Sequence, residues 1–272
     1  MPSPDWPADP QQLRLEVHAL RDALIAALDA RVPAQAVRGV YFKGSASKPW
    51  PAPLDYVPEL SDLDLHVWFH ENAAPVWLAR FREAVFALEF AQDAEDRFSQ
   101  ACPAPHHVPR PQLLLLNGVD LSGWTRSHVQ VLRGEPYPGA EATAAEDRAR
   151  LLEVSAQAAG LGLDLLDKVG PQLWTALRQL NWRVSPLPAR LLSAAGAGPE
   201  VWHEPRSVLL ADLDARGFGA VADELRAYYA HAWAAFGTGW RDAALMRRAV
   251  LHALEALRQA ARAVDGGEGG NA

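Results

Sequence analysis

The sequence predicts an α+β protein in which a small mixed β-sheet is followed by an all-α bundle of helices. Between residues 36 and 135, short apolar runs bounded by Gly, Pro and Asn alternate with helix-like stretches, as expected for a sheet with covering helices. Beyond residue 139 the composition changes to Ala, Leu and Arg, and few strand signals remain. The Pro- and Gly-rich residues 134–139 separate the two regions and mark the domain boundary.

Four segments follow from this pattern. Residues 1–35 contain a predicted amphipathic helix over 10–31 that packs on the sheet domain. Its apolar residues recur at helical spacing, namely Leu13, Val17, Leu20, Leu24 and Leu28. Residues 36–138 form the sheet domain and residues 139–265 the helical domain. We expect the Gly-rich residues 266–272 to be a disordered tail.

Individual elements can be predicted within these segments. The apolar runs around 40–42, 62–67, 113–116 and 128–132 predict strands, and residues 73–92 predict one helix. In the helical domain, the pattern predicts helices near residues 143–168, 171–182, 186–195, 217–235 and 239–264. The sequence contains no internal repeat.

Composition narrows the classes of function. The chain has 272 residues, 49% of them apolar, which is enough for a sizeable core. A formal net charge of −7 disfavours general nucleic-acid binding, which needs a basic surface, and favours a neutral or cationic partner. Cys102 is the single cysteine, so neither an internal disulfide nor a cysteine-rich zinc site is possible. With no apolar run of membrane-spanning length and no signal-peptide pattern, we expect a cytoplasmic protein; its oligomeric state stays open.

The run Asp62-Leu63-Asp64-Leu65 is the strongest functional signal in the chain. On a strand, alternate side chains share a face, so both carboxylates point to one side, about 7 Å apart, with the leucines on the other side. Carboxylate oxygens suit Mg²⁺, which usually binds one or two carboxylates together with substrate phosphates. Two such ions about 4 Å apart can activate an attacking hydroxyl and stabilise a leaving oxygen.

Gly44-Ser45 ends the apolar run Val40-Tyr41-Phe42 and supplies a second signal. Glycine lets backbone amides approach an anion closely, and the serine hydroxyl can donate a hydrogen bond to a phosphate oxygen. The two signals together predict a site where the carboxylates hold metal while amides and hydroxyl hold a triphosphate. The same letters in Asp212-Leu213-Asp214 carry no such meaning, because that stretch is predicted to be helical and residues two apart on a helix do not face each other.

These residues resemble the DNA polymerase β-type nucleotidyltransferase superfamily, including the antibiotic and other small-molecule nucleotidyltransferases. The family signature is an apolar strand ending in Gly-Gly or Gly-Ser, followed by an Asp-x-Asp strand. Gly44-Ser45 matches the first part and Ser61-Asp62-Leu63-Asp64-Leu65 the second, within a similar region of residues 36–133. The resemblance implies a nucleotidyltransferase domain with an appended helical domain, an NTP donor, two Mg²⁺ ions and an acceptor bound beside the helices.

The resemblance also implies a third carboxylate on a neighbouring strand. Asn117-Gly118 lies between apolar runs and is a strong hairpin signal, which would place Asp120 on the returning strand. In that position Asp120 would share a metal and accept or orient the proton of the attacking hydroxyl. The other interpretation is an ordinary aspartate beside a turn, in which case an inactive relative stays open.

Four prolines lie between the two halves of the motif, at Pro49, Pro51, Pro53 and Pro58. Because proline is tolerated in a helix only near its first turn, we predict an extended loop here, with Lys48 and Trp50 lining the nucleotide pocket. For His106-His107, which lies in another Pro-rich segment, we expect a surface loop rather than a metal site, since partners at ligand spacing are missing.

Two classes of function remain open. The first is an enzyme that moves a nucleoside monophosphate from an NTP, with ATP as the expected donor, to a hydroxyl or similar nucleophile of a small molecule, and releases pyrophosphate. Its site residues would be Gly44, Ser45 and Lys48 for the nucleotide and Asp62, Asp64 and Asp120 for catalysis and metal. A variant acts on a protein or an RNA end, although the acidic balance disfavours RNA. The second class is an inactive relative that serves as an interaction or regulatory protein.

Overall fold

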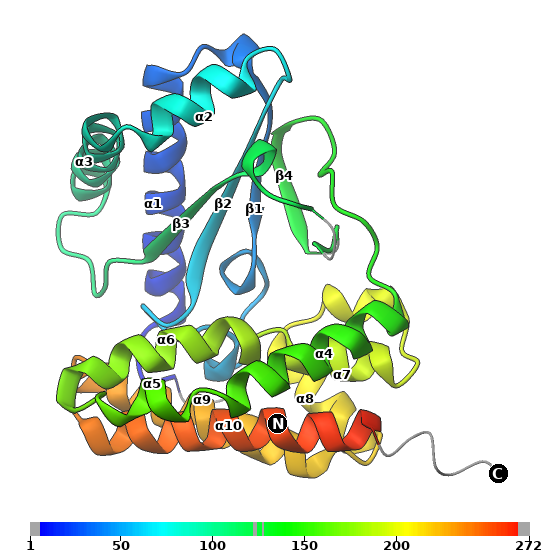
Figure 1. Cartoon of the computed structure of the whole chain (residues 1–272). Coiled ribbons are helices and arrows are strands. Elements are labelled where there is room, and N and C mark those ends of the chain that lie inside the picture. The colour runs from blue at the N-terminus through cyan, green and yellow to red at the C-terminus, as the bar shows by residue number, and fades with distance from the viewer. Residues whose placement is uncertain (1–5, 122–123, 127, 266–272) are drawn as a thin grey trace. The chain divides into compact units, whose positions relative to one another are not determined.

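The computed structural model describes residues 6–121, 124–126 and 128–265. It is a mixed α/β structure in which a four-stranded mixed sheet precedes a set of helices in the chain (Figure 1). This confirms the order of sheet and helices predicted from the sequence. The tail expected over residues 266–272 lies outside the described residues. Within the described ranges, no helix combines the length and the apolar character required to cross a bilayer.

The chain forms two compact units that are not continuous in sequence. The sheet unit contains Ala8–Lys48 and Ser61–Ala140. The helical unit contains Pro49–Leu60 and the chain from Glu141 onward, together with Trp6 and Pro7. The Pro-rich stretch between Gly44-Ser45 and Asp62 therefore belongs to the helical unit.

Helix α1 (Pro10–Arg31) opens the sheet unit and occupies the predicted range. Its start is fixed by Asp9, whose Oδ1 accepts a hydrogen bond from the Gln11 amide at 2.9 Å, and by proline in the first helical position. The apolar stripe is buried as predicted, at Leu13, Val17, Leu20, Leu24 and Leu28. This stripe attaches α1 to the rest of the sheet unit.

The sheet has the strand order β3-β2-β1-β4. Its strands are β1 (Val37–Lys43), β2 (Asp62–Phe69), β3 (Arg110–Leu115) and β4 (Val129–Gly134). Strand β1 is antiparallel to both β2 and β4, whereas β3 is parallel to β2. The two strands rich in motif residues, β1 and β2, therefore lie at the centre, and β3 and β4 lie at opposite edges.

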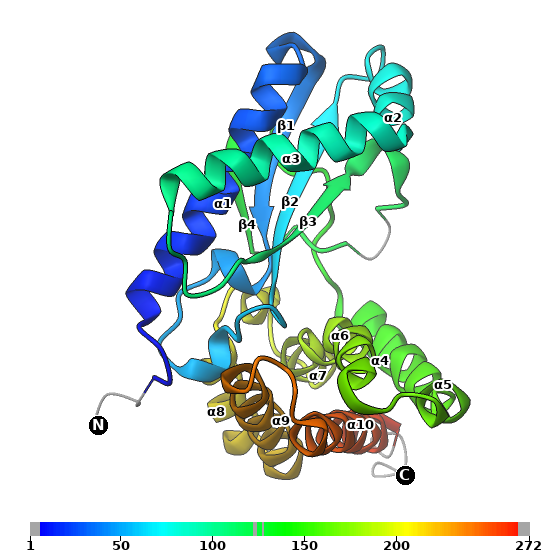
Figure 2. The ribbon, with the colours of Figure 1, turned by 90° about the vertical axis from the view of Figure 1, so that its left-hand side faces the viewer.

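One face of the sheet is apolar and covered by helices α1, α2 (Ala74–Arg82) and α3 (Ala84–Ala101), as Figure 2 shows. The residues of this face are fully buried and include Val40, Phe42, Leu63, Leu65 and Val67. A single helix was predicted over 73–92. Instead, Glu83 is extended, with ψ of 121°, and this break lets Phe81 and Phe86 pack edge to face across the corner.

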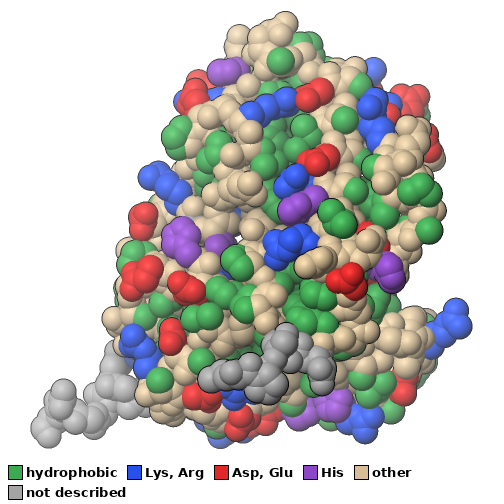
Figure 3. Space-filling view, turned by 180° about the vertical axis from the view of Figure 1, so that it is seen from behind, with side chains coloured by type: hydrophobic (Ala, Val, Ile, Leu, Met, Phe, Trp, Pro, Cys, Tyr) green, Lys and Arg blue, Asp and Glu red, His purple; other side chains and the backbone are tan. Residues whose placement is uncertain are grey.

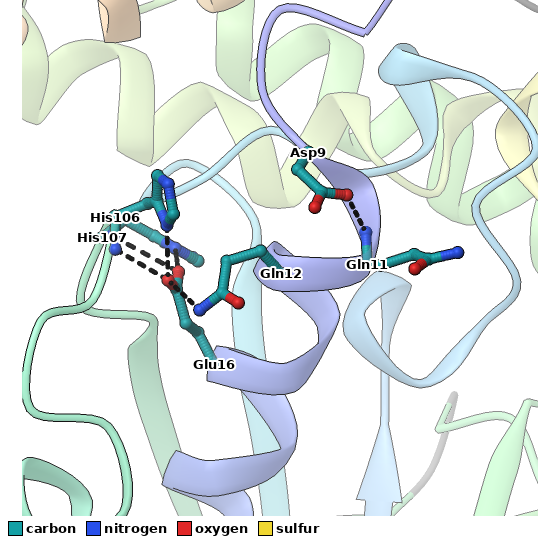
Figure 4. A network of polar contacts seen from close by, with 6 residues as sticks. All are labelled: Asp9, Gln11, Gln12, Glu16, His106 and His107. Atoms are coloured by element: carbon teal, nitrogen blue, oxygen red, sulfur yellow. Dashed lines mark hydrogen bonds and ion pairs between the residues drawn. The ribbon is translucent and has the colours of Figure 1, made fainter.

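A buried carboxylate ties α1 to the segment that precedes β3 (Figure 4). Glu16 is 0% exposed, and its oxygens accept hydrogen bonds from the backbone amide of His106 at 2.7 Å and from Gln12 Nε2 at 3.0 Å. His107 Nδ1 lies 2.6 Å from Glu16 Oε2, and its side chain is also buried. The prediction of a surface loop is therefore wrong for His107, because this histidine is an internal partner of a helix carboxylate.

Part of the opposite face of the sheet is covered by residues that follow β3 and β4, and these precede α4 (Ala144–Ala159) in the chain. Tyr41, Leu116 and Tyr137 form a small buried cluster there, joined by Trp68 and Leu114 among others. The Tyr41 and Tyr137 rings meet edge to face at 5.1 Å, and Tyr41 Oη donates to the carbonyl of Glu135 at 2.9 Å. This face is therefore half core and half polar, with the polar part toward the motif residues.

The predicted hairpin at Asn117-Gly118 is wrong. These residues form a 3₁₀ turn with Leu116, and β3 pairs with β2 instead of with a returning strand. Asn117 uses its side chain at the end of β2, accepting from the Phe69 amide at 2.8 Å and donating to the Phe69 carbonyl at 3.0 Å. Asn117 is therefore bonded to the end of β2 instead of forming a two-residue hairpin turn. Asp120 lies outside the strands and not on a returning strand.

Beyond residue 141, the helical unit contains α4, α5 (Gly162–Leu166), α6 (Leu173–Val184), α7 (Leu187–Ala194), α8 (Arg206–Ala215), α9 (Gly219–Gly237) and α10 (Ala243–Asp265). The long helix α10 packs along α9 and also contacts α4, α6 and α7. The predicted helix over 143–168 is interrupted near Gly160, where the chain turns into α5. The ranges of α6, α7, α9 and α10 agree with the prediction to within a few residues. Helix α8 has no counterpart among the predicted ranges, although the stretch around residues 212–214 was predicted to be helical.

The Pro-rich stretch is anchored by buried side chains of its own unit, so the prediction of a plain extended loop is only partly correct. Pro53–Asp55 forms a 3₁₀ turn. Arg206 donates to the carbonyls of Leu54 and Asp55 at 2.8 and 3.0 Å, and Asp55 accepts from Ser207 twice, at 2.8 Å each. Hydrogen bonds of this kind fix the stretch against the helices.

Candidate functional site

The polar part of the sheet carries a row of charged and amide side chains across three strands. Asp62 and Asp64 lie two apart on β2 and therefore share one face. Lys43 on β1 is the register partner of Asp64, and Gln112 on β3 is the partner of Asp64 on its other side. Arg110 on β3 is the partner of Asp62. Side chains of register partners share a face, so these five residues surround one place on the sheet.

Gly44 brings the two halves of the sequence motif into contact. It follows β1 directly and has φ of 79° and ψ of −169°, a backbone conformation that essentially only glycine adopts. A Cβ at this position would overlap the Asp64 carboxylate. Ser45 then begins a 3₁₀ turn, which Ser47 closes by donating its hydroxyl to the Gly44 carbonyl at 2.8 Å. The Gly-Ser turn and the carboxylate of Asp64 are therefore adjacent, as the sequence predicts.

Lys43 and Asp64 form a cation and carboxylate pair whose charges are both perturbed. Burial raises the pKa of Asp64 to about 7, against the opposing effect of the Lys43 charge. Burial also lowers the pKa of Lys43 to about 8, against the opposing effect of Asp64. Lys43 Nζ donates to the carbonyl of Thr125 at 2.6 Å. Two such shifts in neighbouring groups are typical of functional sites, although structural ion pairs produce them too.

His66 continues the same face of β2, one position beyond Asp64 in the alternation. Burial, and then the charge of Lys43, lower the pKa of His66 to about 3, so the ring is neutral near pH 7. Its Nδ1 lies 3.0 Å from Tyr137 Oη, and its ring meets Trp124 edge to face at 5.5 Å. His66 therefore forms an aromatic wall beside the charged row.

Arg110 forms an ion pair with Asp62. The two side chains are 24% and 19% exposed, so the pair is mostly shielded from solvent but still partly accessible.

Sequence reasoning missed Arg110, Gln112, Lys43 and His66 as site residues. Lys43 and His66 had a local signal, because they lie beside Gly44 and in phase with Asp64. Arg110 and Gln112 had none, since their place depends on the parallel register of β3.

The remaining predicted site residues lie differently. Asp120 is not on a strand, and its role as the third carboxylate stays a prediction. Across the described ranges, no three His, Cys, Asp or Glu side chains come together as a metal-binding group. Lys48 is the last residue of the first part of the sheet unit, and its carbonyl accepts from Arg14 Nη2 at 2.9 Å. Trp50 is buried in the helical unit, stacked on Tyr56 at 4.1 Å, and serves its core.

Asp62 and Asp64 form a donor set that fits Mg²⁺. Asp62 and Asp64 offer carboxylate oxygens on one strand face, which together with phosphates is a usual way to bind Mg²⁺. A two-ion site needs further anionic donors between the ions, and the adjacent strand offers Arg110 and Gln112 at those register positions. The expectation of two ions stays a prediction, with an amide and a guanidinium at the positions beside the two acids.

The second Asp-x-Asp sequence is a helical surface feature, as predicted. Asp212 and Asp214 lie on α8 and are exposed. Asp214 forms an ion pair with Arg226 of α9. These exposed carboxylates provide a natural control for experiments on Asp62 and Asp64.

On the face of the molecule drawn in Figure 3, basic, acidic and histidine side chains are interspersed rather than gathered by sign.

Comparison with protein-family models, with curated proteins and with solved structures finds no match to this chain. The functional interpretation therefore depends on the geometry of the site and on the motif.

Proposed function

We propose that this protein binds a nucleoside triphosphate with Mg²⁺ and transfers the nucleoside monophosphate to a small-molecule acceptor, releasing pyrophosphate. The observation that supports this most is the contact between Gly44 and the Asp64 carboxylate. It joins an anion-binding turn to a metal-binding carboxylate within the reach of one ligand. Either half alone would be a common structural feature.

The roles of the chain's own residues follow from chemistry. Backbone amides near Gly44 and the hydroxyl of Ser45 would donate hydrogen bonds to phosphate oxygens. Asp62 and Asp64 would bind the magnesium ion, which neutralises phosphate charge and polarises the α-phosphate. When the triphosphate is absent, the positive charge of Lys43 would partly compensate the negative charge of the Asp64 carboxylate. The neutral ring of His66 and its partner Tyr137 would form a wall beside the bound nucleotide.

The transfer itself balances as follows. An oxygen of the acceptor hydroxyl bonds to the α-phosphorus, and the bond from that phosphorus to the bridging oxygen of the β-phosphate breaks. Pyrophosphate leaves with that electron pair, and the hydroxyl proton passes to solvent water. Catalysis of such a step depends mainly on positioning and on electrostatic stabilisation.

Equilibrium binding tests the first half of this proposal. We expect ATP to bind in the presence of Mg²⁺. The Asp62→Asn variant, which lacks one carboxylate, should bind it about tenfold more weakly. The matched control is Asp212→Asn, which makes the same change in the exposed second motif and should leave binding unaltered. An equal loss of ATP affinity in both variants would contradict the proposal. So would ATP binding that does not depend on Mg²⁺.

A second candidate function has one specific observation in its favour. The strand next to β2 places Gln112 opposite Asp64, where a third acid would otherwise complete the site. A protein with this arrangement could bind nucleotide and signal its presence without turnover. Pyrophosphate release in the presence of a panel of hydroxylated small molecules separates the two functions. Release that depends on Asp64 supports transfer, whereas Mg²⁺-dependent binding without release across the panel supports the nucleotide-binding regulator.

A further inference from the structure

Strand β3 presents a cation and an amide to the acidic pair of β2. Asp62 is the register partner of Arg110 and Asp64 that of Gln112, and in a parallel ladder such partners direct their side chains to one face. Arg110 is joined to Asp62 by an ion pair. Gln112 is exposed, so the edge of the sheet is open to solvent at this position.

The charges of this arrangement leave little place for a second metal ion. Asp62 and Asp64 bring two negative charges when ionised, while Arg110 and Lys43 stand beside them as cations. The Gln112 side chain brings no charge and is a weaker ligand for Mg²⁺ than a carboxylate. Arginine is always protonated and offers five N–H donors in a planar fork, so it can bond a carboxylate and a phosphate together.

Resting on the function proposed above, we propose that this site takes one divalent cation with the triphosphate, and that Arg110 supplies the positive charge that a second ion would bring. The guanidinium is paired with Asp62, and its remaining N–H groups can donate hydrogen bonds to phosphate oxygens. Gln112 marks the position at which an added acid would create the second metal site. Arg110 is thus a binding residue for phosphate and a determinant of metal number.

Metal stoichiometry is the direct test. Mn²⁺ is titrated into the full chain with saturating α,β-methylene-ATP, and the unbound Mn²⁺ is read by electron paramagnetic resonance. We expect one bound Mn²⁺ per bound nucleotide for the natural chain and two for Gln112→Asp. The matched control is Gln130→Asp on the other edge strand, whose register partner Phe42 lies on the opposite face, and it should keep one.

Substitutions at Arg110 provide an independent arm. We expect Arg110→Gln to weaken binding of the nucleotide analogue about tenfold at saturating Mg²⁺, and Arg110→Lys to recover part of that loss, because a charge is restored without the fork. Thermal unfolding of each variant is measured alongside. An Arg110→Gln variant that is folded and binds the analogue as tightly as the natural chain would overturn the assignment of Arg110 to phosphate.

The outcomes separate this inference from the function on which it rests. Two Mn²⁺ per nucleotide in the natural chain would overturn the single-cation site while leaving nucleotide binding intact. A single Mn²⁺ in Gln112→Asp, with that variant folded, would overturn the assignment of position 112. Failure of the natural chain to bind the analogue at all would overturn the proposed function, and this inference with it.

Discussion

Gly44 and Asp64 are packed so closely that a methyl group on Gly44 would occupy the space of the Asp64 carboxylate. Gly44 directly follows β1, whereas Asp64 lies on β2, 20 positions further along the chain. The contact is possible because β1 and β2 pair in a register that places Lys43 opposite Asp64, with the turn following at once. One glycine therefore determines both the backbone of the turn and the place of a carboxylate.

Replacing Gly44 by alanine should damage stability and nucleotide binding together. The substitution places a side chain in a conformation that only glycine favours and pushes it against Asp64, so we expect a loss of about 3 kcal/mol in the free energy of unfolding. ATP binding should become too weak to measure. Chemical denaturation and calorimetric titration check the two effects.

Gly196→Ala is the control for that experiment. Gly196 also has positive φ, at 86°, but a Cβ there would meet nothing within 4 Å. It should cost about 1 kcal/mol, from backbone strain alone, and leave ATP binding unchanged. If both substitutions cost the same, the collision with Asp64 does not exist in solution.

Removing the charge of Asp64 should stabilise the fold in a defined pH range. Burial raises the pKa of this carboxyl to about 7 from an ordinary value of 3.8, so the folded state holds the proton more tightly than the unfolded state. The stabilisation is complete below pH 3.8 and is lost as the pH rises through about 7. Asp64→Asn should therefore match the natural chain only near pH 3.8 and below, exceed its unfolding free energy slightly at about pH 5, and exceed it by roughly 2 kcal/mol more near about pH 8 than at about pH 5.

Asp22→Asn is a suitable comparison, because Asp22 is 63% exposed and should show the same difference at both pH values. Burial lowers the pKa of Lys43 to about 8, so Lys43 changes the pH dependence of the unfolding free energy mainly above pH 8. Below that pH, the difference between the variants reports on Asp64. An Asp64→Asn variant that is less stable than the natural chain at both pH values would mean that the carboxylate is not buried as described.

The buried carboxylate of Glu16 should be important for the sheet unit at neutral pH. Burial disfavours its charge, but hydrogen bonds from the His106 amide, Gln12 and His107 outweigh burial and hold the pKa of Glu16 below its ordinary value of 4.5. Glu16→Gln should cost about 2 kcal/mol of unfolding free energy at neutral pH. Since a lowered carboxyl pKa stabilises the fold above the unfolded value, this cost should shrink as the pH falls below 4.5.

Glu83→Gln provides the surface counterpart in the same unit. Glu83 pairs with Arg80, and both side chains are about half exposed, so the change should stay within about 0.5 kcal/mol. Thermal and urea unfolding of the two variants give the comparison. A Glu16→Gln cost as small as that of Glu83→Gln would show that the histidine contacts do not stabilise the fold.

Arg206 should be the main polar anchor of the Pro-rich stretch in the helical unit. It is 4% exposed and donates to the carbonyls of Leu54 and Asp55 and to Ser185 Oγ. Arg206→Met keeps much of the volume but leaves buried acceptors without their donor, and we expect a loss of about 3 kcal/mol. The exposed Arg216→Met should be neutral, and equal effects in urea unfolding would refute the anchoring role.

Local pattern was sufficient for much of the fold. The spacing of Leu13 and its partners determined α1, and the alternation through Leu63 and Leu65 placed Asp62 and Asp64 on the polar face of a strand. These features depend on neighbours within a few residues. The closeness of the Gly44-Ser45 turn to Asp64 was also predicted, because the two motif parts together indicate one site for metal and triphosphate.

Long-range register was not available from local pattern. Asn117-Gly118 carries the letters of a hairpin, but Asn117 binds the end of β2 through its side chain, and this choice depends on where Phe69 lies. The parallel pairing of β3 with β2 then places Arg110 and Gln112 beside the acids, while Asp120 falls outside the strands. A one-residue difference in that register would have exchanged Gln112 for Pro111 or Leu113 on the polar face.

Anomalous X-ray scattering from crystals of the protein grown with Mn²⁺ and α,β-methylene-ATP tests the central claim most directly. Our account predicts a Mn²⁺ peak bonded to carboxylate oxygens of both Asp62 and Asp64, with a phosphate of the analogue against the Gly44-Ser45 turn. Nucleotide bound elsewhere, or Mn²⁺ absent from these two carboxylates while the analogue is present, would contradict it.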